Sequence, residues 1–475
     1  MSKAAKSRES RLAIESHGIE YIPPSDRHGR PGSLLPFWFA GNVQITLVAI
    51  GAIAPALGLD LAWSLISLVV GNLIGALFMA YHSAQGPRLG LPQMIQSRAQ
   101  FGFAGAALPL IVAVLMYMAF FITSAILGGE ALAGLIHVPN TWGIVLVSIV
   151  TVLLTWVGYD IFHSLARPIS VASGIIFFAL TIRLVGELPS HYHATGVTAG
   201  HVLLAISIAA TGQITWAPYV SDYSRYLPED TSARKTFAYT YIGSAIGGSW
   251  MECLGAVAVL VSADAFANGP VFMAGQFSAT RWLILLVIII GVVFVNMENL
   301  YGTFLTSLAS LSPSGTFASG KTLRLIFTTV AGAVGTLFAI LASAHLIVDL
   351  ENFLLFLLYL MVPWTAINLT DYYLIRHGQY SIPEFFKADG AFGRVNIFAV
   401  ALFAATVLIE VPFMNTALYV GPVANALGGA DIAWIVGLFF ASGVYYLVKS
   451  RAFQHPAISQ QATENPTALR VTDER

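Results

Sequence analysis

Apolar runs long enough to cross a lipid bilayer recur along almost the whole of this 475-residue chain. A transmembrane helix needs about 20 mostly apolar residues, and runs of that length alternate here with short connectors that carry most of the charges. Only 10% of the residues are charged, whereas soluble domains carry about 25%. The pattern therefore predicts an all-α integral membrane protein that crosses the bilayer many times.

The apolar runs predict twelve transmembrane helices, with boundaries defined to within a few residues. They lie at 34–58, 62–83, 105–133, 141–158, 161–186, 199–220, 235–260, 281–309, 322–343, 352–376, 394–414 and 431–449.

Lys and Arg residues are concentrated on one side of these spans. The two tails and the connectors after the even-numbered spans hold almost all of them, and the opposite connectors hold only Arg183 and Arg281, at helix edges. Because positively charged connectors remain in the cytoplasm, both termini are predicted to be cytoplasmic. The N-terminal segment is polar and has no apolar core, so we expect no cleavable signal peptide. We expect a multi-pass protein of the cytoplasmic (inner) membrane.

Charge and cysteine content argue against several other classes of protein. The net charge of −1 gives no indication of nucleic-acid binding, and a single cysteine, Cys253, excludes a disulfide framework. An integral-membrane enzyme would need a cluster of His, Asp or Glu residues with ligand or triad spacing. The spans contain no such cluster, and His163 and His345 are isolated, so we expect no catalytic residues, no metal site and no cofactor.

Two of the predicted spans are interrupted by glycine next to polar residues. The first reads "PFWFAGNVQITLVAIGAIAP", with Gly41 followed by Gln44, and the sixth reads "ISIAATGQITWAP", with Gly212 followed by Gln213. Either glycine alone could merely allow close helix packing. Two such sites five spans apart favour a transporter built from inverted repeats, with broken first and sixth helices.

The eighth predicted span, "LVIIIGVVFVNMENLYGTFLTSL", is also polar. Asn296, Asn299 and Thr303 recur on one helical face, and Glu298 is offset from it. An ionisable residue at this depth indicates function, although a purely structural hydrogen bond is the alternative. Glu130 and Glu252 are further acids within spans, and for these we expect structural roles.

Three connectors carry motifs that resemble a known family. "GPRLGLPQMIQSRAQFG", "WAPYVSDYSRYLP" and "PWTAINLTDYYLIRHGQY" follow the second, sixth and tenth spans. Together they resemble the nucleobase–cation symporter family, which includes purine–cytosine, allantoin and uracil permeases and a hydantoin transporter. The resemblance extends over essentially all twelve spans.

This resemblance implies an inverted five-plus-five helix repeat with two extra C-terminal helices. The transport core is then expected at 34–376 and the accessory transmembrane helices at 377–449. Residues 1–33 and 450–475 would be cytoplasmic tails.

The resemblance also implies site residues. Substrate would lie between the broken helices and the third and eighth spans. On the family pattern, Ala40 and Val43 align with carbonyl donors to a cation, and Gln44 with an amide that contacts the ligand. Phe120 and Ser124 match a stacking aromatic residue and a polar partner, with Phe in place of the usual Trp and Ser in place of the usual amide. The remaining substrate positions are Gly212, Gln213 and Asn299.

One departure from the family pattern concerns the coupling cation. Sodium-coupled members carry two adjacent hydroxyl residues shortly before the ligand-binding Asn, and Val293 and Phe294 occupy those positions here. We therefore expect proton rather than sodium coupling, with Glu298 as the candidate carrier. The rival interpretation makes Glu298 structural and gives Asn296 a part in holding Na⁺.

The leading expectation is import of a nucleobase or related planar nitrogen heterocycle by cation symport. A flat base could stack on Phe120, and the amides of Gln44, Gln213 and Asn299 match its alternating donors and acceptors. An amino-acid or other small-metabolite permease on the same scaffold is the alternative within transport, and an integral-membrane enzyme is the alternative from another class. The expected partners are the heterocycle, H⁺ or Na⁺, and the lipid bilayer.

Overall fold

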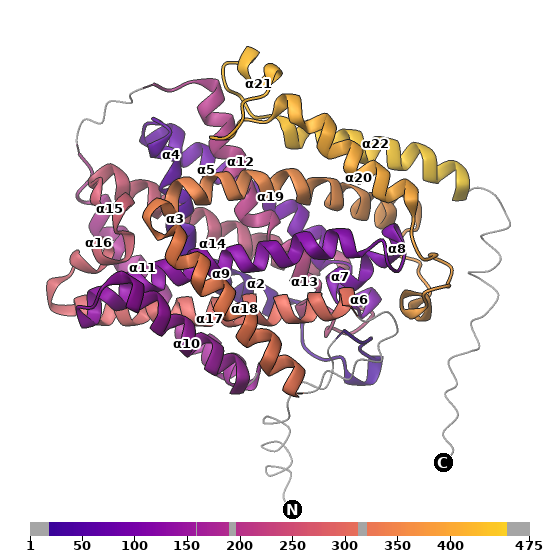
Figure 1. Ribbon diagram of the computed structural model, residues 1–475, viewed down its shortest axis with the longest axis horizontal. Coiled ribbons are helices and arrows are strands. Elements are labelled where there is room, and N and C mark those ends of the chain that lie inside the picture. Colours follow the sequence, from indigo (N-terminus) through magenta and orange to yellow (C-terminus); the bar gives the residue numbers. More distant parts are fainter. Residues whose placement is uncertain (1–18, 158, 190–195, 312–320, 454–475) are drawn as a thin grey trace, which may run out of the picture.

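The computed structural model describes residues 19–157, 159–189, 196–311 and 321–453. Within these ranges the chain is helical, with connectors between the helices and one isolated bridge between Asn415 and Val420 (Figure 1). Every one of the twelve predicted segments contains helix. The outermost parts of the two predicted tails lie outside the described residues.

The first five predicted spans are formed by α2 to α5 and α9 to α11. Their bounds are α2 Leu34–Asn42, α3 Ile45–Gly51, α4 Ile53–Ala56, α5 Leu61–Ser83, α9 Ala107–Ile136, α10 Asn140–Val157 and α11 Tyr159–Val185. Three short helices, α6 Gly86–Leu89, α7 Gln93–Gln96 and α8 Arg98–Phe101, form the connector between α5 and α9.

The remaining spans run from α12 to α22. Their bounds are α12 Ala199–Ile214, α13 Ala217–Ser224, α14 Ala233–Val261, α17 Arg281–Leu311, α18 Lys321–Ala342, α19 Leu346–Leu369 with the π-helical turn η5 Thr370–Ile375, α20 Ile397–Glu410 and α22 Ala433–Phe453. Short helices lie in the connectors: α15 Asp264–Ala267, α16 Gly269–Gly275, η4 Ser343–His345 and α21 Pro422–Ala426.

Several of these helices begin at residues that cap them. The side chains of Asp60, Thr198 and Ser232 accept hydrogen bonds from the backbone N–H groups three residues later, at the starts of α5, α12 and α14. Such caps satisfy backbone donors that have no partner within the helix. The polar residues between apolar runs thus fix where the spans begin.

The described residues include eight helical segments long and apolar enough to cross a membrane, and nine when the bent pair 31–42 and 45–56 is one span. One of the eight, Thr322–Ile375, runs through both α18 and α19, and two further apolar helices are shorter. Large apolar side chains such as Ile175, Leu341 and Phe439 are exposed on outer helix faces. The chain is therefore a multi-pass membrane protein, and the total of twelve crossings stays a prediction.

In an inverted repeat, each contact between two spans should recur between their counterparts in the other repeat, and the contacts between helices show this pattern. α5 packs on α12 and α14 packs on α2, so the second span contacts the sixth as the seventh contacts the first. Likewise α9 contacts α19 and α17 contacts α11. The pairs α5–α14, α9–α17 and α10–α18 each join a span to its counterpart. This pairing fits a pseudo-twofold relation between spans one to five and six to ten.

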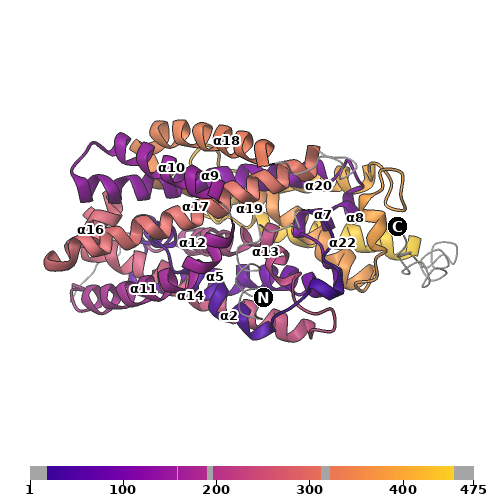
Figure 2. The same cartoon turned by 90° about the horizontal axis from the view of Figure 1, so that it is seen from below.

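Two sets of helices pack mainly among themselves. The first helix group comprises α2, α3, α5, α12 and α14, and the second helix group comprises α9, α10, α17 and α18. Figure 2 shows α10 and α18 along one edge of the molecule and α2, α11 and α14 along the opposite edge. α3 contacts both α9 and α17, so the broken first helix lies where the two groups meet.

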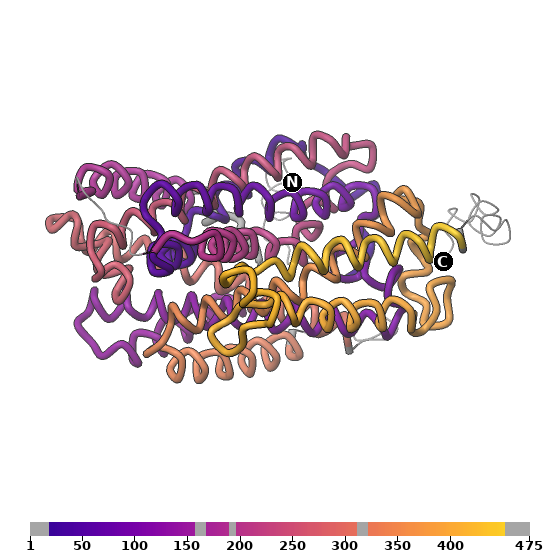
Figure 3. Tube along the Cα trace, turned by 90° about the horizontal axis from the view of Figure 1, so that it is seen from above, coloured from indigo at the N-terminus to yellow at the C-terminus, as the bar shows by residue number. Residues whose placement is uncertain are grey.

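The two C-terminal helices are peripheral to this arrangement. α20 and α22 pack against each other and against α19, and they run side by side at one edge of the molecule (Figures 1 and 3).

The crowded polar connector after the sixth span joins two parts of the chain. Ser221 donates a hydrogen bond to Gln93 Oε1 at 2.5 Å, and Ser224 donates to the Ser83 carbonyl at 2.7 Å. The backbone N–H of Gln93 donates to Asp222 at 2.8 Å. The motif "WAPYVSDYSRYLP" therefore attaches α13 to the connector that follows α5.

Candidate functional site

The first helix is broken between Asn42 and Ile45. Gln44 is extended, with φ −148° and ψ 158°, and the segments on either side meet at a bend of 66°. The Val43 N–H donates to the Ala40 carbonyl at 3.1 Å, and the Gln44 side chain donates to the Gly41 carbonyl at 3.3 Å. Gln44 Oε1 is buried without a partner. The predicted break is confirmed, and it leaves one amide oxygen free at the interface between the helix groups.

The interruption of the sixth helix lies later than the sequence predicts. α12 continues through Gly212 and Gln213 to Ile214, and Thr215 and Trp216 separate it from α13. Pro218, at the start of α13, has no N–H to donate to the Ile214 carbonyl, so the helical hydrogen-bond ladder stops there. The two pieces count as one span, 199–224, without the sharp bend of the first helix. The expectation of an opening at Gly212 was therefore wrong.

The third span meets the broken helix just beyond the break. The hydroxyls of Thr46 on α3 and Ser124 on α9 are 3.0 Å apart, and both side chains are buried. One turn before Ser124, the ring of Phe120 is partly buried and makes an edge-on contact with Phe353 of α19, with centroids 5.8 Å apart. Phe120 and Ser124 are thus at the group interface that the resemblance implies.

The polar face of α17 is hydrogen-bonded toward α9. Asn299 Nδ2 donates to Asn296 Oδ1 at 3.2 Å, and Asn296 Nδ2 donates to the Phe121 carbonyl at 3.1 Å. Thr303 donates to the Asn299 carbonyl of its own helix. Val43, Met297 and Phe120 belong to or pack on one apolar cluster. The structure therefore brings the first break, α9 and α17 into one region.

Gln213 is directed into the first helix group. Its Nε2 donates to Asn42 Oδ1 at 3.0 Å and to Asn72 Oδ1 at 2.7 Å, and its Oε1 accepts from Ser244 at 2.5 Å. All four side chains are fully buried. Each polar group of the Gln213 amide has a partner in this conformation, so a ligand could bind it only by displacing one of them.

Glu298 lies nearer the α13 side of the interface. Its Oε1 accepts a hydrogen bond from the Tyr223 hydroxyl at 3.2 Å. The Tyr223 ring packs on Phe37 and Trp38, with centroid distances of 4.5 Å and 5.4 Å. Glu298 therefore joins the second helix group to the aromatic residues around α2 and α13.

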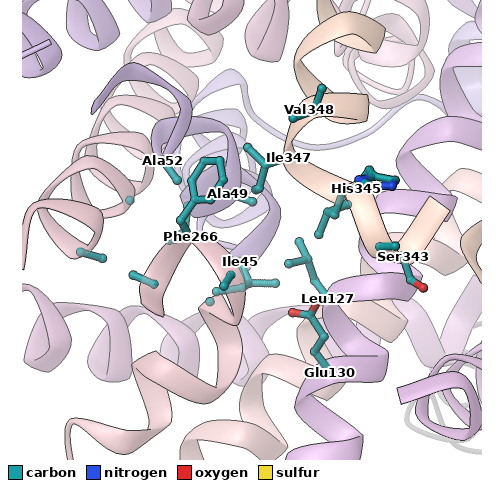
Figure 4. Close-up of a pocket in the computed structure, with 18 residues that line it drawn as sticks. Ile45, Ala49, Ala52, Leu127, Glu130, Phe266, Ser343, His345, Ile347 and Val348 are labelled. Atoms are coloured by element: carbon teal, nitrogen blue, oxygen red, sulfur yellow. The ribbon is translucent and has the colours of Figure 1, made fainter. Parts of the chain in front are cut away.

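A cavity of about 300 Å³ begins at Ile45, immediately after the first break. Figure 4 shows Ala49 of α3, Ala52 between α3 and α4, Leu127 and Glu130 of α9, and His345 around it. It lies at the end of the bundle that holds the connectors 262–280 and 343–345, which the Lys and Arg pattern assigns to the outside. Ile45 lines the cavity, and none of the substrate residues expected from the sequence does. The cavity therefore adjoins the break in the first helix but does not enclose the predicted site.

The sequence reasoning missed several residues that the structure places around the breaks. Asn72, Ser244 and Thr46 are buried polar partners of the expected residues. Trp216 lies 3.8 Å from where a Cβ on Gly41 would be. The signal available was their polarity within apolar spans.

Comparison with known proteins gives a consistent result. A family model described as permease for cytosine/purines, uracil, thiamine and allantoin matches residues 21–437. The putative purine-cytosine permease YxlA of Bacillus subtilis is 41% identical over 92% of this chain and 96% of its own length. The purine-cytosine permease fcyB of Emericella nidulans is 28% identical over 92% of this chain and 89% of its own.

A solved structure shares the fold. The nucleobase-cation-symport-1 family transporter Mhp1, in a closed conformation with bromovinylhydantoin bound, superposes with a TM-score of 0.73 over 95% of this chain and 99% of that one. Its sequence identity is 17%, so this likeness concerns the fold alone.

Proposed function

This chain belongs to the family of permeases for cytosine/purines, uracil, thiamine and allantoin, and from that premise we propose that it imports a purine- or cytosine-like base by symport with a cation. It is a transport protein and not an enzyme. The substrate site of the proposal is the interface between the two helix groups at the break in the first helix.

The observation that carries this proposal is the break at Gln44. An open backbone within a bilayer is tolerated only where it lines a cavity or is buried in protein. Here it lies beside Thr46 and Ser124, with Gln44 Oε1 buried and unpartnered. A base that donates an N–H to this oxygen would satisfy an acceptor that otherwise costs free energy.

In this proposal an aromatic ring and several side-chain amides recognise the base. Phe120 offers a ring for stacking, and Asn299 and Gln44 offer both donors and acceptors. Gln213 would contribute after release from Asn42 or Asn72. Ser124 would act through its hydroxyl, and Gly212 through its lack of a side chain.

We propose the proton as coupling ion. Na⁺ prefers several oxygen ligands, and Val293 and Phe294 supply no side-chain oxygen where sodium-coupled members have two hydroxyls. The Ala40 carbonyl accepts from the Val43 N–H and keeps a second lone pair, but the carbonyls of Ala40 and Val43 alone are too few for a Na⁺ site. Glu298, hydrogen-bonded to Tyr223 across the interface, is the proposed proton carrier. In the rival assignment Glu298 is structural and Asn296 helps to bind a sodium ion.

The proposed location is the cytoplasmic membrane with both termini inside. The Lys and Arg distribution supports it. In that orientation the cavity beside Ile45 faces outward, where a substrate for import would enter.

A competition experiment tests the proposal. Whole cells that express the chain are given radiolabelled cytosine together with an excess of unlabelled purines, pyrimidines, allantoin, hydantoin or amino acids. We expect purines or cytosine to reduce uptake and amino acids to have no effect. Cytosine uptake no greater than in cells without the chain would contradict the proposal and favour the small-metabolite permease instead.

A further inference from the structure

A carboxyl group on α14 lies at the centre of the first helix group. The Glu252 side chain is fully buried. Its Oε2 accepts a hydrogen bond from Asn72 Nδ2 at 2.6 Å, and its Oε1 has no partner. Oε1 is directed at α12, because a Cβ on Gly212 would lie 3.0 Å from it.

No positive charge compensates this carboxyl in the part of the chain that the structure describes. The helices around it present Gly51 from α3, Asn72 from α5 and Gly212 from α12, none of which titrates. Cys253, the next residue on α14, is its titratable neighbour and is not a cation. An ionised carboxylate buried with one hydrogen bond and no cation is strongly unfavourable. In this conformation Glu252 therefore holds a proton.

We propose that Glu252 is a proton-binding site of the transport core, and that its occupancy determines how the two interrupted helices are held together. The inference rests on the proposed transport function. It concerns a residue separate from Glu298, which lies across the group interface beside Tyr223.

A chain of hydrogen bonds connects this carboxyl to both interrupted helices. Asn72 donates to Glu252 and accepts from Gln213, which lies one residue before the end of α12. Gln213 also donates to Asn42, the last residue of α2. Three hydrogen bonds therefore lead from the Glu252 carboxyl to the end of the broken first helix.

Loss of the Glu252 proton to solvent would leave an uncompensated charge in this network. The first helix group would then have to admit water or a cation at Oε1, which is directed at Gly212, and the packing of α14 on α12 would have to open there. A conformation that exposes Glu252 favours the ionised form, and the packed conformation favours the protonated form. Proton binding thus shifts the equilibrium between the two, as any ligand with different affinities does.

The first test needs no substrate. Infrared difference spectra of the full chain in liposomes, recorded between acidic and alkaline pH, report the C=O stretch of protonated carboxylic acids. We expect a band in the wild-type protein that is lost in Glu252→Gln and retained, at an altered position, in Glu252→Asp. A spectrum unchanged by Glu252→Gln would overturn the proposal. If the Gln variant does not fold, Glu252→Asp is the test, and a band at an unaltered position would overturn the proposal.

The second test measures equilibrium binding of labelled cytosine to purified protein across pH. If one proton binds together with the substrate at Glu252, log affinity falls by about one for each pH unit in the wild type, and Glu252→Gln brings this slope to about zero. Glu410→Gln is the matched control, because Glu410 on α20 is equally buried with both oxygens unpartnered but lies outside both helix groups. An unchanged slope in Glu252→Gln, or an equal change in Glu410→Gln, would overturn the assignment.

Failure of the proposed transport function and failure of the Glu252 inference give different results. A wild-type protein that binds no base in the competition panel would contradict the proposed function, while the infrared band would still decide whether Glu252 takes up a proton. A wild-type protein that binds cytosine, with no Glu252 band and no change of slope, would contradict the Glu252 inference alone.

Discussion

Gly248 on α14 lies so close to Gln213 on α12 that a Cβ atom at position 248 would be 2.0 Å from Gln213 Nε2. The same Cβ would be 2.2 Å from Asn72 Oδ1. The hydrogen-bonded network of the first helix group therefore exists because this position has no side chain. Any substitution must displace the Gln213 and Asn72 side chains, which also hydrogen-bond to Asn42, Ser244 and Glu252.

Gly248→Ala is accordingly expected to destabilise the protein. Separating Gln213 from Asn72 leaves buried polar groups unpaired, at a cost of roughly 1–3 kcal/mol, and overpacking adds to it. The melting temperature of the purified protein in detergent measures the effect. Gly291→Ala on α17 is the control, because nothing lies within 4 Å of its Cβ position. Equal melting temperatures for both variants would mean that the network does not depend on Gly248.

The helix positions could be predicted from the sequence because hydrophobic length is a local property. All twelve apolar runs contain helix, and the break at Gln44 lies at the residue that the Gly41-Asn42 signal indicates. The break in the sixth helix was misplaced because glycine was given more weight than Pro218, whose missing N–H has the stronger effect on a helix.

The partners of the polar residues could not be predicted in the same way. Gln213 was expected to face a ligand, and it is bonded to Asn42, Asn72 and Ser244. These residues lie on helices far apart in the sequence, and a single sequence does not state which faces meet. Glu252 was expected to be structural for the same reason, since its contact with Asn72 depends on how α5 and α14 pack.

The predicted orientation can be tested by cysteine labelling. In a Cys253→Ala background, Thr141→Cys at the start of α10 and Asp230→Cys after α13 place single thiols at exposed positions. We expect a membrane-impermeant maleimide to label Thr141→Cys in intact cells and to label Asp230→Cys only after permeabilisation. Labelling of Asp230→Cys from outside would reverse the orientation derived from Lys and Arg.

Asn299→Ala is expected to weaken substrate binding. Loss of an amide that pairs with the base should cost roughly 1–3 kcal/mol, which is about tenfold to a hundredfold in affinity. The measurement is uptake of labelled cytosine at limiting concentration. Asn352→Ala on α19 is the control, since this half-buried Asn bonds only to Val348 and Ala417 among the contacts described. Unchanged uptake in Asn299→Ala would remove α17 from the substrate site.

Glu298→Gln is expected to uncouple uptake from the proton gradient. The carboxyl accepts from Tyr223 at 3.2 Å, so binding or release of its proton alters a contact between α17 and α13, which belong to different sides of the interface. In sodium-free vesicles with an inward proton gradient, wild-type uptake should proceed and should collapse with a protonophore. In Glu298→Gln the residual uptake should no longer respond to the gradient, because a neutral amide cannot bind or release a proton there.

Tyr223→Phe keeps the ring packing on Phe37 and Trp38 and removes only the hydroxyl, so uptake should slow and yet remain driven by protons. Strict sodium dependence, with no response to the protonophore at fixed membrane potential, would contradict proton coupling and favour Asn296 and a sodium ion in its place.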